Sequence, residues 1–208
     1  MPAELCYLDE VVPGICVDLK YCGSDNFVGR PIDGYTTGSR AILRRDMAER
    51  LAKVQNELAT KGLALKVWDA YRPHRATKDF LAWFRTPDES QKATFYPNIS
   101  KQGILENRFI SRRSAHSYGL AVDVTLIQLE TGQELDMGGR HDLLDASSAT
   151  RYAGITAEQR ANRLLLLNTM GKAGFLNYRK EWWHFFRRND GTATRYDFPL
   201  NDHLIPQP

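Results

Sequence analysis

The stretch SRRSAHSYGLAVDVTL, residues 111–126, places two unusual residues close together. His116 lies in a turn-like segment, and Asp123 interrupts an apolar run. That run predicts a strand over about 120–127, where a buried carboxylate is costly unless a partner offsets its charge. Because His116 and Asp123 are an odd number of positions apart, one uninterrupted strand would point them to opposite sides. We expect Gly119 to bend the chain so that both side chains point at one centre.

A second stretch, EWWHFF, covers residues 181–186 and combines a carboxylate, two tryptophans and a histidine. The aromatic run predicts a strand from which His184 projects among bulky rings, with Glu181 where the strand begins. Two histidines and an aspartate can fill three positions of a tetrahedral zinc site and leave the fourth for water. From residue types alone, two interpretations stay open: a catalytic zinc site, or histidines with separate structural roles.

The order of predicted elements indicates one α+β domain over residues 1–208, with a small, mainly antiparallel central sheet flanked by helices. Residues 86–113 are expected to form a long irregular loop of the kind that often covers a binding site. Residues 5–35 are expected to form short strands and loops, and the chain after Arg188 should be irregular. Helices are expected at 40–61, 74–85 and 157–173, and strands at 63–72, 120–127 and 175–186.

Three local patterns carry further expectations. Thr156 and Gln159 form a capping-box pattern at the start of the helix over 157–173. Residues 164–167 are four leucines, apolar all round, which predicts that this helix is central and buried. In the strand that begins at Leu63, strict alternation would place Asp69 on the same face as Val67.

Composition excludes several classes of protein. Lys and Arg number 28 against 25 Asp and Glu, a net charge of +3, which is far from the basic stripe of a nucleic-acid-binding protein. No segment approaches the roughly 18 apolar residues of a membrane span, and the first residues, MPAELCYLDEVVPG, show no signal peptide. The odd cysteine count without a CxxC pair favours reduced thiols at Cys6, Cys16 and Cys22, with one disulfide the alternative. We therefore expect a cytoplasmic protein without nucleic-acid or membrane partners. A periplasmic location, if a signal peptide has been removed, and a homo-oligomer stay open.

The segments SAHSYGLAVDVTL and EWWHF resemble the S-x-H-x-x-G-x-A-x-D and E-x-W-H motifs of the zinc D-alanyl-D-alanine dipeptidases of the VanX type, in peptidase family M15. LKYCGSDNFVGRPIDGY, VWDAYRP, LDMGGRHD and NRLLLLNTMGKAGF resemble further segments of the family, so the resemblance extends along most of the chain. It implies the fold shared by hedgehog-type domains and D,D-peptidases.

The resemblance also implies roles for individual residues. His116, Asp123 and His184 would bind one Zn²⁺ per chain, with Glu181 the catalytic base and Arg72 the group that stabilises the oxyanion. Asp142 would hold the ammonium of a D-Ala-D-Ala dipeptide. The remaining substrate-binding candidates near the peptide termini are Ser114, Ser117 and Tyr21. His141 is expected at the rim of the pocket.

The activity implied is hydrolysis of D-Ala-D-Ala to free D-alanine by attack of metal-bound water. The alternatives are a D,D-carboxypeptidase or endopeptidase acting on peptidoglycan stem peptides, and a non-catalytic zinc-stabilised binding module. Structural zinc requires neither Glu181 nor Arg72, so their joint presence argues against the binding module. Two biological roles are compatible with the dipeptidase: glycopeptide (vancomycin) resistance and recycling of D-alanine.

Overall fold

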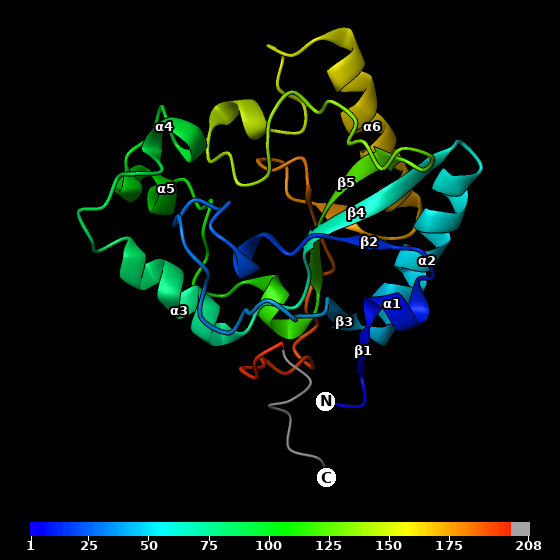
Figure 1. Ribbon diagram of the computed structural model, residues 1–208, viewed down its shortest axis with the longest axis horizontal. Helices are drawn as coiled ribbons and strands as arrows, with labels where there is room; N and C mark the ends of the chain where they lie inside the picture. Colours follow the sequence, from blue (N-terminus) through cyan, green and yellow to red (C-terminus); the bar gives the residue numbers. More distant parts are fainter. Residues whose placement is uncertain (201–208) are drawn as a thin grey trace.

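The computed structural model describes residues 1–200 and places a five-stranded sheet at the centre of the molecule (Figure 1). The strand order is β2-β4-β5-β7-β6; only the β2–β4 pair is parallel, so the sheet is mainly antiparallel, as expected. A separate antiparallel pair joins β1 and β3. The strands are β1 (Leu5–Tyr7), β2 (Cys16–Val17), β3 (Ile42–Arg44), β4 (Leu63–Asp69), β5 (Ala121–Gln128), β6 (Leu176–Asn177) and β7 (His184–Phe186).

Helices cover the sheet from two sides. In Figure 1, α3, α4 and α5 lie together on one side of the sheet, and α2 and α6 lie on the other. The α-helices are α1 (Leu8–Val11), α2 (Arg45–Ala59), α3 (His74–Trp83), α4 (Lys92–Phe95), α5 (Lys101–Glu106) and α6 (Ala157–Lys172). Short 3₁₀ turns cover Lys20–Cys22, Ala115–Tyr118 and Ala146–Ser148. Among residues 1–200, no helix is long and apolar enough to cross a bilayer.

Helix α2 follows its sequence pattern closely. Met47, Leu51, Val54 and Leu58 repeat at helical spacing and are all buried against the core, which fixes the face that the helix presents to the sheet. The predicted start at residue 40 is wrong, because residues 42–44 pair with β1 as strand β3 before the helix begins.

Helix α6 begins as predicted, with Thr156 and Gln159 forming a complete capping box. The prediction that it is central and buried is wrong, because Leu166 is the one leucine of residues 164–167 that is fully buried. The helix is held instead by Arg163, whose buried guanidinium donates to the carbonyls of Met137 at 2.6 Å and Ala149 at 2.8 Å. A helix anchored through such polar contacts lies at the edge of the core.

The alternation predicted along β4 is broken by a bulge. Val67 pairs with Val124, and the next pair along the ladder joins Asp69 to Asp123, so Trp68 is an extra residue in β4. Residues that pair across a ladder share a face. Asp69 therefore lies on the face of Asp123 rather than with Val67, which corrects the sequence expectation.

The last predicted strand, over 175–186, is a short hairpin made of β6 and β7. The side-chain amide of Asn177 donates from Nδ2 to the backbone carbonyls of Glu181 at 3.1 Å and His184 at 3.0 Å. These bonds stabilise the turn between the strands. Glu181 lies in this turn, three residues before β7 begins.

The segment 86–113 is less irregular than expected because it contains α4 and α5. The described residues after Arg188, up to 200, form no helix or strand, and the remainder of the predicted irregular tail, 201–208, lies outside the described residues.

Candidate metal centre and active site

The bend expected at Gly119 is present. Residues 115–118 form a 3₁₀ turn that ends at Gly119 with φ +65°, in the left-handed region that glycine adopts readily. A Cβ at this position would meet a side-chain atom of Leu5 at 2.9 Å. The bend brings His116 Nε2 to 3.4 Å from Asp123 Oδ1, so the two side chains point at one centre.

His184 joins this pair from the neighbouring strand. Asp123 and His184 are directly paired across the β5–β7 ladder, and such partners project from the same face. His184 Nδ1 lies 2.8 Å from Asp123 Oδ1 and 3.1 Å from His116 Nε2. One ligand atom from each of the three residues lies within 4.8 Å of the others, which makes the trio a candidate metal site. We call these three residues the metal cluster.

The chemistry of the donor atoms fits zinc. His116 Nδ1 lies 2.6 Å from the carbonyl oxygen of Ala70, which can only accept, so Nδ1 carries the proton and Nε2 presents its lone pair to the cluster. Burial lowers the pKa of His184 and keeps its imidazole neutral. Burial alone would raise the pKa of Asp123, but the three surrounding histidines hold that pKa well below its ordinary value. Two imidazoles and a carboxylate are a donor set that zinc accepts.

The cluster opens into a cavity of about 280 Å³, which we call the catalytic cavity. Glu181 lines it and is 7% exposed. Burial, together with the negative charges of Asp123 and Asp142, raises the pKa of Glu181 well above its ordinary value. A carboxyl group with a raised pKa holds a proton more readily, which suits a group that must accept a proton and then return it. The other predicted site residues that line the catalytic cavity are Tyr21, Arg72, Ser114 and Asp142.

Arg72 is held at the cavity by an acid that the sequence analysis did not assign to the site. Its Nε lies 2.9 Å and its Nη2 2.8 Å from Asp69 Oδ2, and Tyr35 Oη donates to Asp69 Oδ1 at 2.6 Å. Asp69 is fully buried, and the β4 bulge is what turns it towards Arg72. The sequence did contain a pattern that could have indicated this role, because Asp69 interrupts an apolar strand in the same way as Asp123 does.

Two of the candidate substrate-binding residues contact each other. Tyr21 Oη donates to Asp142 Oδ2 at 2.8 Å, and burial raises the pKa of Asp142. Ser114 lines the catalytic cavity, but Ser117 does not. The Ser117 hydroxyl is buried with no hydrogen-bond partner among the described residues, and its carbonyl accepts from the Tyr196 amide at 2.9 Å. The geometry therefore gives Ser117 no contact with the space where a substrate would lie.

His141 is not the rim residue that the sequence suggested. It is 5% exposed, and its ring lies 5.0 Å from that of Trp68 and 5.6 Å from that of Trp183. Its Nε2 lies 3.3 Å from Asp123 Oδ2, whereas the histidines of the metal cluster contact Asp123 Oδ1. His141 thus contacts the carboxylate of a metal-cluster residue through a hydrogen bond. No spacing rule in the sequence indicated that contact.

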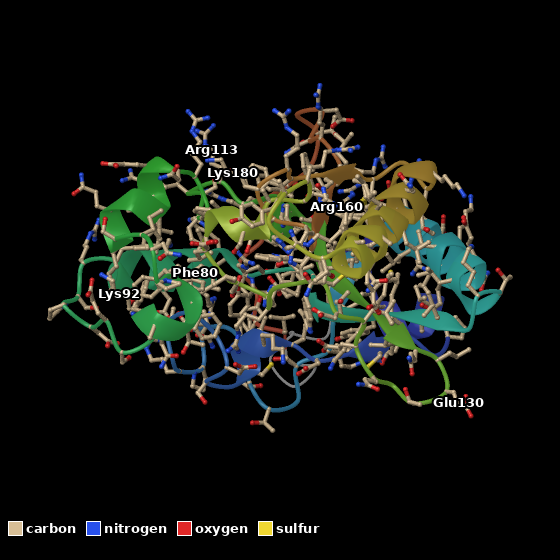
Figure 2. The ribbon with its side chains drawn as sticks, turned by 90° about the horizontal axis from the view of Figure 1, so that it is seen from above. Phe80, Lys92, Arg113, Glu130, Arg160 and Lys180 are labelled. Carbon is tan, nitrogen blue, oxygen red and sulfur yellow. The ribbon has the colours of Figure 1, made fainter. Side chains whose placement is uncertain are left out.

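The end of the 86–113 segment forms the outer wall of the catalytic cavity, which includes residues 108–111 and 113. The wall is tied to the β6–β7 turn: Lys180 Nζ donates to the Asn107 carbonyl at 2.6 Å, and Tyr178 Oη donates to the Arg108 carbonyl at 3.0 Å. Figure 2 labels Arg113, from this wall, and Lys180, from the turn that ties it. The outer wall of the cavity therefore carries the cations Arg108 and Arg113.

Comparisons with known proteins identify the family of this chain. The family model of the M15 peptidases described as D-ala-D-ala dipeptidase matches residues 1–203. A D-alanyl-D-alanine dipeptidase of Enterococcus faecium is 38% identical over 202 residues, covering 96% of this chain and 100% of that protein. One from Streptomyces coelicolor is 37% identical with the same coverage, and one from Escherichia coli is 32% identical over 88% of this chain and 83% of its own length. Because the match spans nearly the whole chain, the protein belongs to the D-Ala-D-Ala dipeptidase family of the M15 peptidases.

Proposed function

We propose that this protein is a zinc-dependent dipeptidase that hydrolyses D-Ala-D-Ala to two molecules of D-alanine. The observation that carries the proposal is the joint placement of the metal cluster, Glu181 and Arg72 around one catalytic cavity. The names of the relatives support the choice of substrate. A zinc ion held by His116, Asp123 and His184 would supply a Lewis acid and lower the pKa of a water molecule beside it.

Glu181 and Arg72 would then carry out the two remaining tasks of peptide hydrolysis. Glu181 accepts a proton from the attacking water and delivers it to the nitrogen of the leaving amine. Arg72 stabilises the negative charge that develops on the carbonyl oxygen of the peptide, because its guanidinium is held rigidly by Asp69 and does not need to reorganise.

The ends of the dipeptide would meet groups of matching charge and hydrogen-bonding capacity. Asp142 is the acid that would pair with the ammonium, and Tyr21 orients it through the 2.8 Å hydrogen bond. Ser114 lines the same cavity and can donate its hydroxyl to the carboxylate end. A cavity of about 280 Å³ with such groups favours a small zwitterionic substrate over a long peptide.

The test compares the rate of hydrolysis of free D-Ala-D-Ala with that of a muramyl pentapeptide, with and without a chelator. We expect faster hydrolysis of the dipeptide and loss of activity on removal of the metal, restored by zinc. Glu181→Gln should lower kcat about 10³-fold with the metal content unchanged. Glu130→Ala is the control and should leave kcat unchanged, because Glu130 is exposed in the turn after β5, does not line the cavity and lies at the other end of the view from Arg113 in Figure 2.

Two results would contradict the proposal. Faster release of D-alanine from the pentapeptide would assign the protein to the carboxypeptidases. A wild-type protein that contains zinc but hydrolyses neither substrate would instead support a binding module.

A further inference from the structure

A second cavity adjoins the catalytic cavity at its outer wall, and the proposed hydrolysis makes no use of it. We call it the adjoining cavity; its volume is about 470 Å³, against about 280 Å³ for the catalytic cavity. Phe109 is the one described residue that lines both cavities. The two spaces therefore meet at Phe109.

Two further segments of the chain pass from one cavity to the other. Asn107 lines the adjoining cavity and its neighbour Arg108 lines the catalytic cavity. In the same way, Lys180 lines the adjoining cavity and its neighbour Glu181 lines the catalytic cavity. Lys180 Nζ donates to the Asn107 carbonyl at 2.6 Å and so joins the two segments where they cross. This hydrogen bond marks the boundary between the cavities.

The ring of Phe109 lies at this boundary. Lys180 Nζ, the donor of that hydrogen bond, is 5.6 Å from the centroid of the Phe109 ring, which is within the range of a cation–π contact. Phe109 is half-buried and packs against the hydrophobic core. The ring is therefore held between the core and the Lys180 ammonium, beside the point where the cavities meet.

The adjoining cavity lies towards the end of the site where the ammonium of a dipeptide would bind. Asp142, the proposed partner of that ammonium, lines the catalytic cavity, and Asp145 lines the adjoining cavity. Three residues span at most about 11 Å, so the two acids are close. A peptide with one more residue at its amino end would have to extend past Asp142 and would meet the boundary at Phe109.

We propose that Phe109 is a specificity-determining residue, whose ring closes the catalytic cavity towards the adjoining cavity and excludes peptides extended at the amino end. The inference rests on the proposed dipeptidase function, because it takes D-Ala-D-Ala as the unit that is cleaved. Exclusion by the shape of an apolar wall is worth about 10- to 200-fold in kcat/KM. Removal of the ring would join the two cavities and admit the additional residue.

The kinetic test compares kcat/KM for Gly-D-Ala-D-Ala with kcat/KM for D-Ala-D-Ala in a size series at position 109. Phe109→Ala should raise this ratio at least about 10-fold, and Phe109→Leu should raise it less. Phe109→Tyr keeps the ring and should keep the wild-type ratio. Phe84→Ala is the matched control, because Phe84 is also half-buried against the core and lines neither cavity; it should leave the ratio unchanged.

A binding measurement separates this inference from the proposed function. Both peptides are titrated calorimetrically into the zinc-loaded Glu181→Gln protein, with and without Phe109→Ala, so that affinity is measured without turnover. Phe109→Ala should raise the affinity for Gly-D-Ala-D-Ala about 10-fold relative to D-Ala-D-Ala. A wild-type protein that does not hydrolyse D-Ala-D-Ala would refute the proposed function, whereas the ratio of affinities would still test the role of Phe109.

Three outcomes would overturn the proposal. An unchanged ratio in both Phe109→Ala and Phe109→Leu would show that the ring does not exclude the tripeptide. A rise in Phe84→Ala as large as in Phe109→Ala would assign the effect to general loosening of the core. A rise in Phe109→Tyr equal to that in Phe109→Ala would contradict a block by the ring. Urea midpoints check folding, and Phe109→Leu carries the test if Phe109→Ala does not fold.

Discussion

Replacing Asp69 with asparagine removes the charge that holds Arg72 at the catalytic cavity. Asp69 is fully buried and Arg72 is 7% exposed, so water screens neither charge. The carboxylate accepts from Arg72 Nε at 2.9 Å, from Arg72 Nη2 at 2.8 Å and from Tyr35 Oη at 2.6 Å. Asp123 is a further acid near the guanidinium, with its Oδ2 3.7 Å from Arg72 Nη2.

These contacts set the size of the expected effect. Removing one partner of a buried ion pair costs about 3–5 kcal/mol, because the other charge stays buried without compensation. Asparagine keeps one acceptor oxygen, so we expect Asp69→Asn to lower the free energy of unfolding by about 3 kcal/mol. A guanidinium drawn towards Asp123 no longer points at the substrate carbonyl, and kcat should fall about 10²- to 10³-fold, as for loss of an oxyanion donor.

Urea unfolding measures the first effect and steady-state kinetics on D-Ala-D-Ala the second. Asp79→Asn is the control: Arg30 binds Asp79 through two nitrogens at 2.6 and 2.8 Å, but the arginine side chain is 50% exposed. Exposed pairs contribute up to about 1 kcal/mol, and this variant should keep its kcat. Equal losses of stability in the two variants would refute the argument that burial strengthens the Asp69–Arg72 pair. An unchanged kcat in Asp69→Asn would refute the argument that Asp69 positions Arg72.

Three further predictions test other parts of the structure. His141→Phe should weaken zinc binding about 10- to 100-fold in chelator competition, because it removes the hydrogen bond to Asp123. His141→Gln keeps an N–H donor and should retain most of the affinity. Equal zinc affinities in the two variants would contradict the idea that His141 stabilises Asp123 as a ligand. Because Arg30 holds the pKa of Asp79 below its ordinary value, the pair stabilises the protein above about pH 4, and this contribution is lost as the pH falls through the folded-state pKa. Asp79→Asn should therefore reduce the loss of stability on acidification below about pH 4, measured by urea unfolding as a function of pH. An unchanged loss of stability would contradict a contribution from the Arg30–Asp79 pair. Gly119→Ala should lower the free energy of unfolding by about 2–4 kcal/mol in thermal unfolding, because backbone strain at φ +65° adds to a contact of 2.9 Å with the Leu5 side chain. The control is Gly132→Ala, at φ +71° in open space, which should cost only the backbone strain of about 1–2 kcal/mol. Similar losses in the two variants would argue against a role for the Leu5 contact.

The site was predictable where local chain geometry decides it. The odd spacing of His116 and Asp123 required a bend, and the only glycine between them, Gly119, supplies it at φ +65°. The apolar spacing of α2 and the capping box of α6 were likewise sufficient to place those helices. In each case the decisive interactions join residues a few positions apart.

The errors arose where a distant partner decides the structure. Strict alternation placed Asp69 on the face of Val67, but pairing with β5 inserts Trp68 as a bulge and turns Asp69 towards Arg72. Four consecutive leucines indicated a central helix, yet the layers packed around α6 bury only Leu166 of the four. His141 was assigned to a rim because its neighbours in the chain do not reveal the indoles that enclose it.

The sequence by itself determined which donor atoms are available, where the main helices run and where the chain must bend between His116 and Asp123. The tertiary structure alone decided that His184, 61 positions after Asp123, would lie opposite it on the next strand, and that Asp69 would hold Arg72. The physical reason is that cross-strand register and burial are set by contacts between segments far apart in the chain. Local propensity and periodicity carry no information on those contacts.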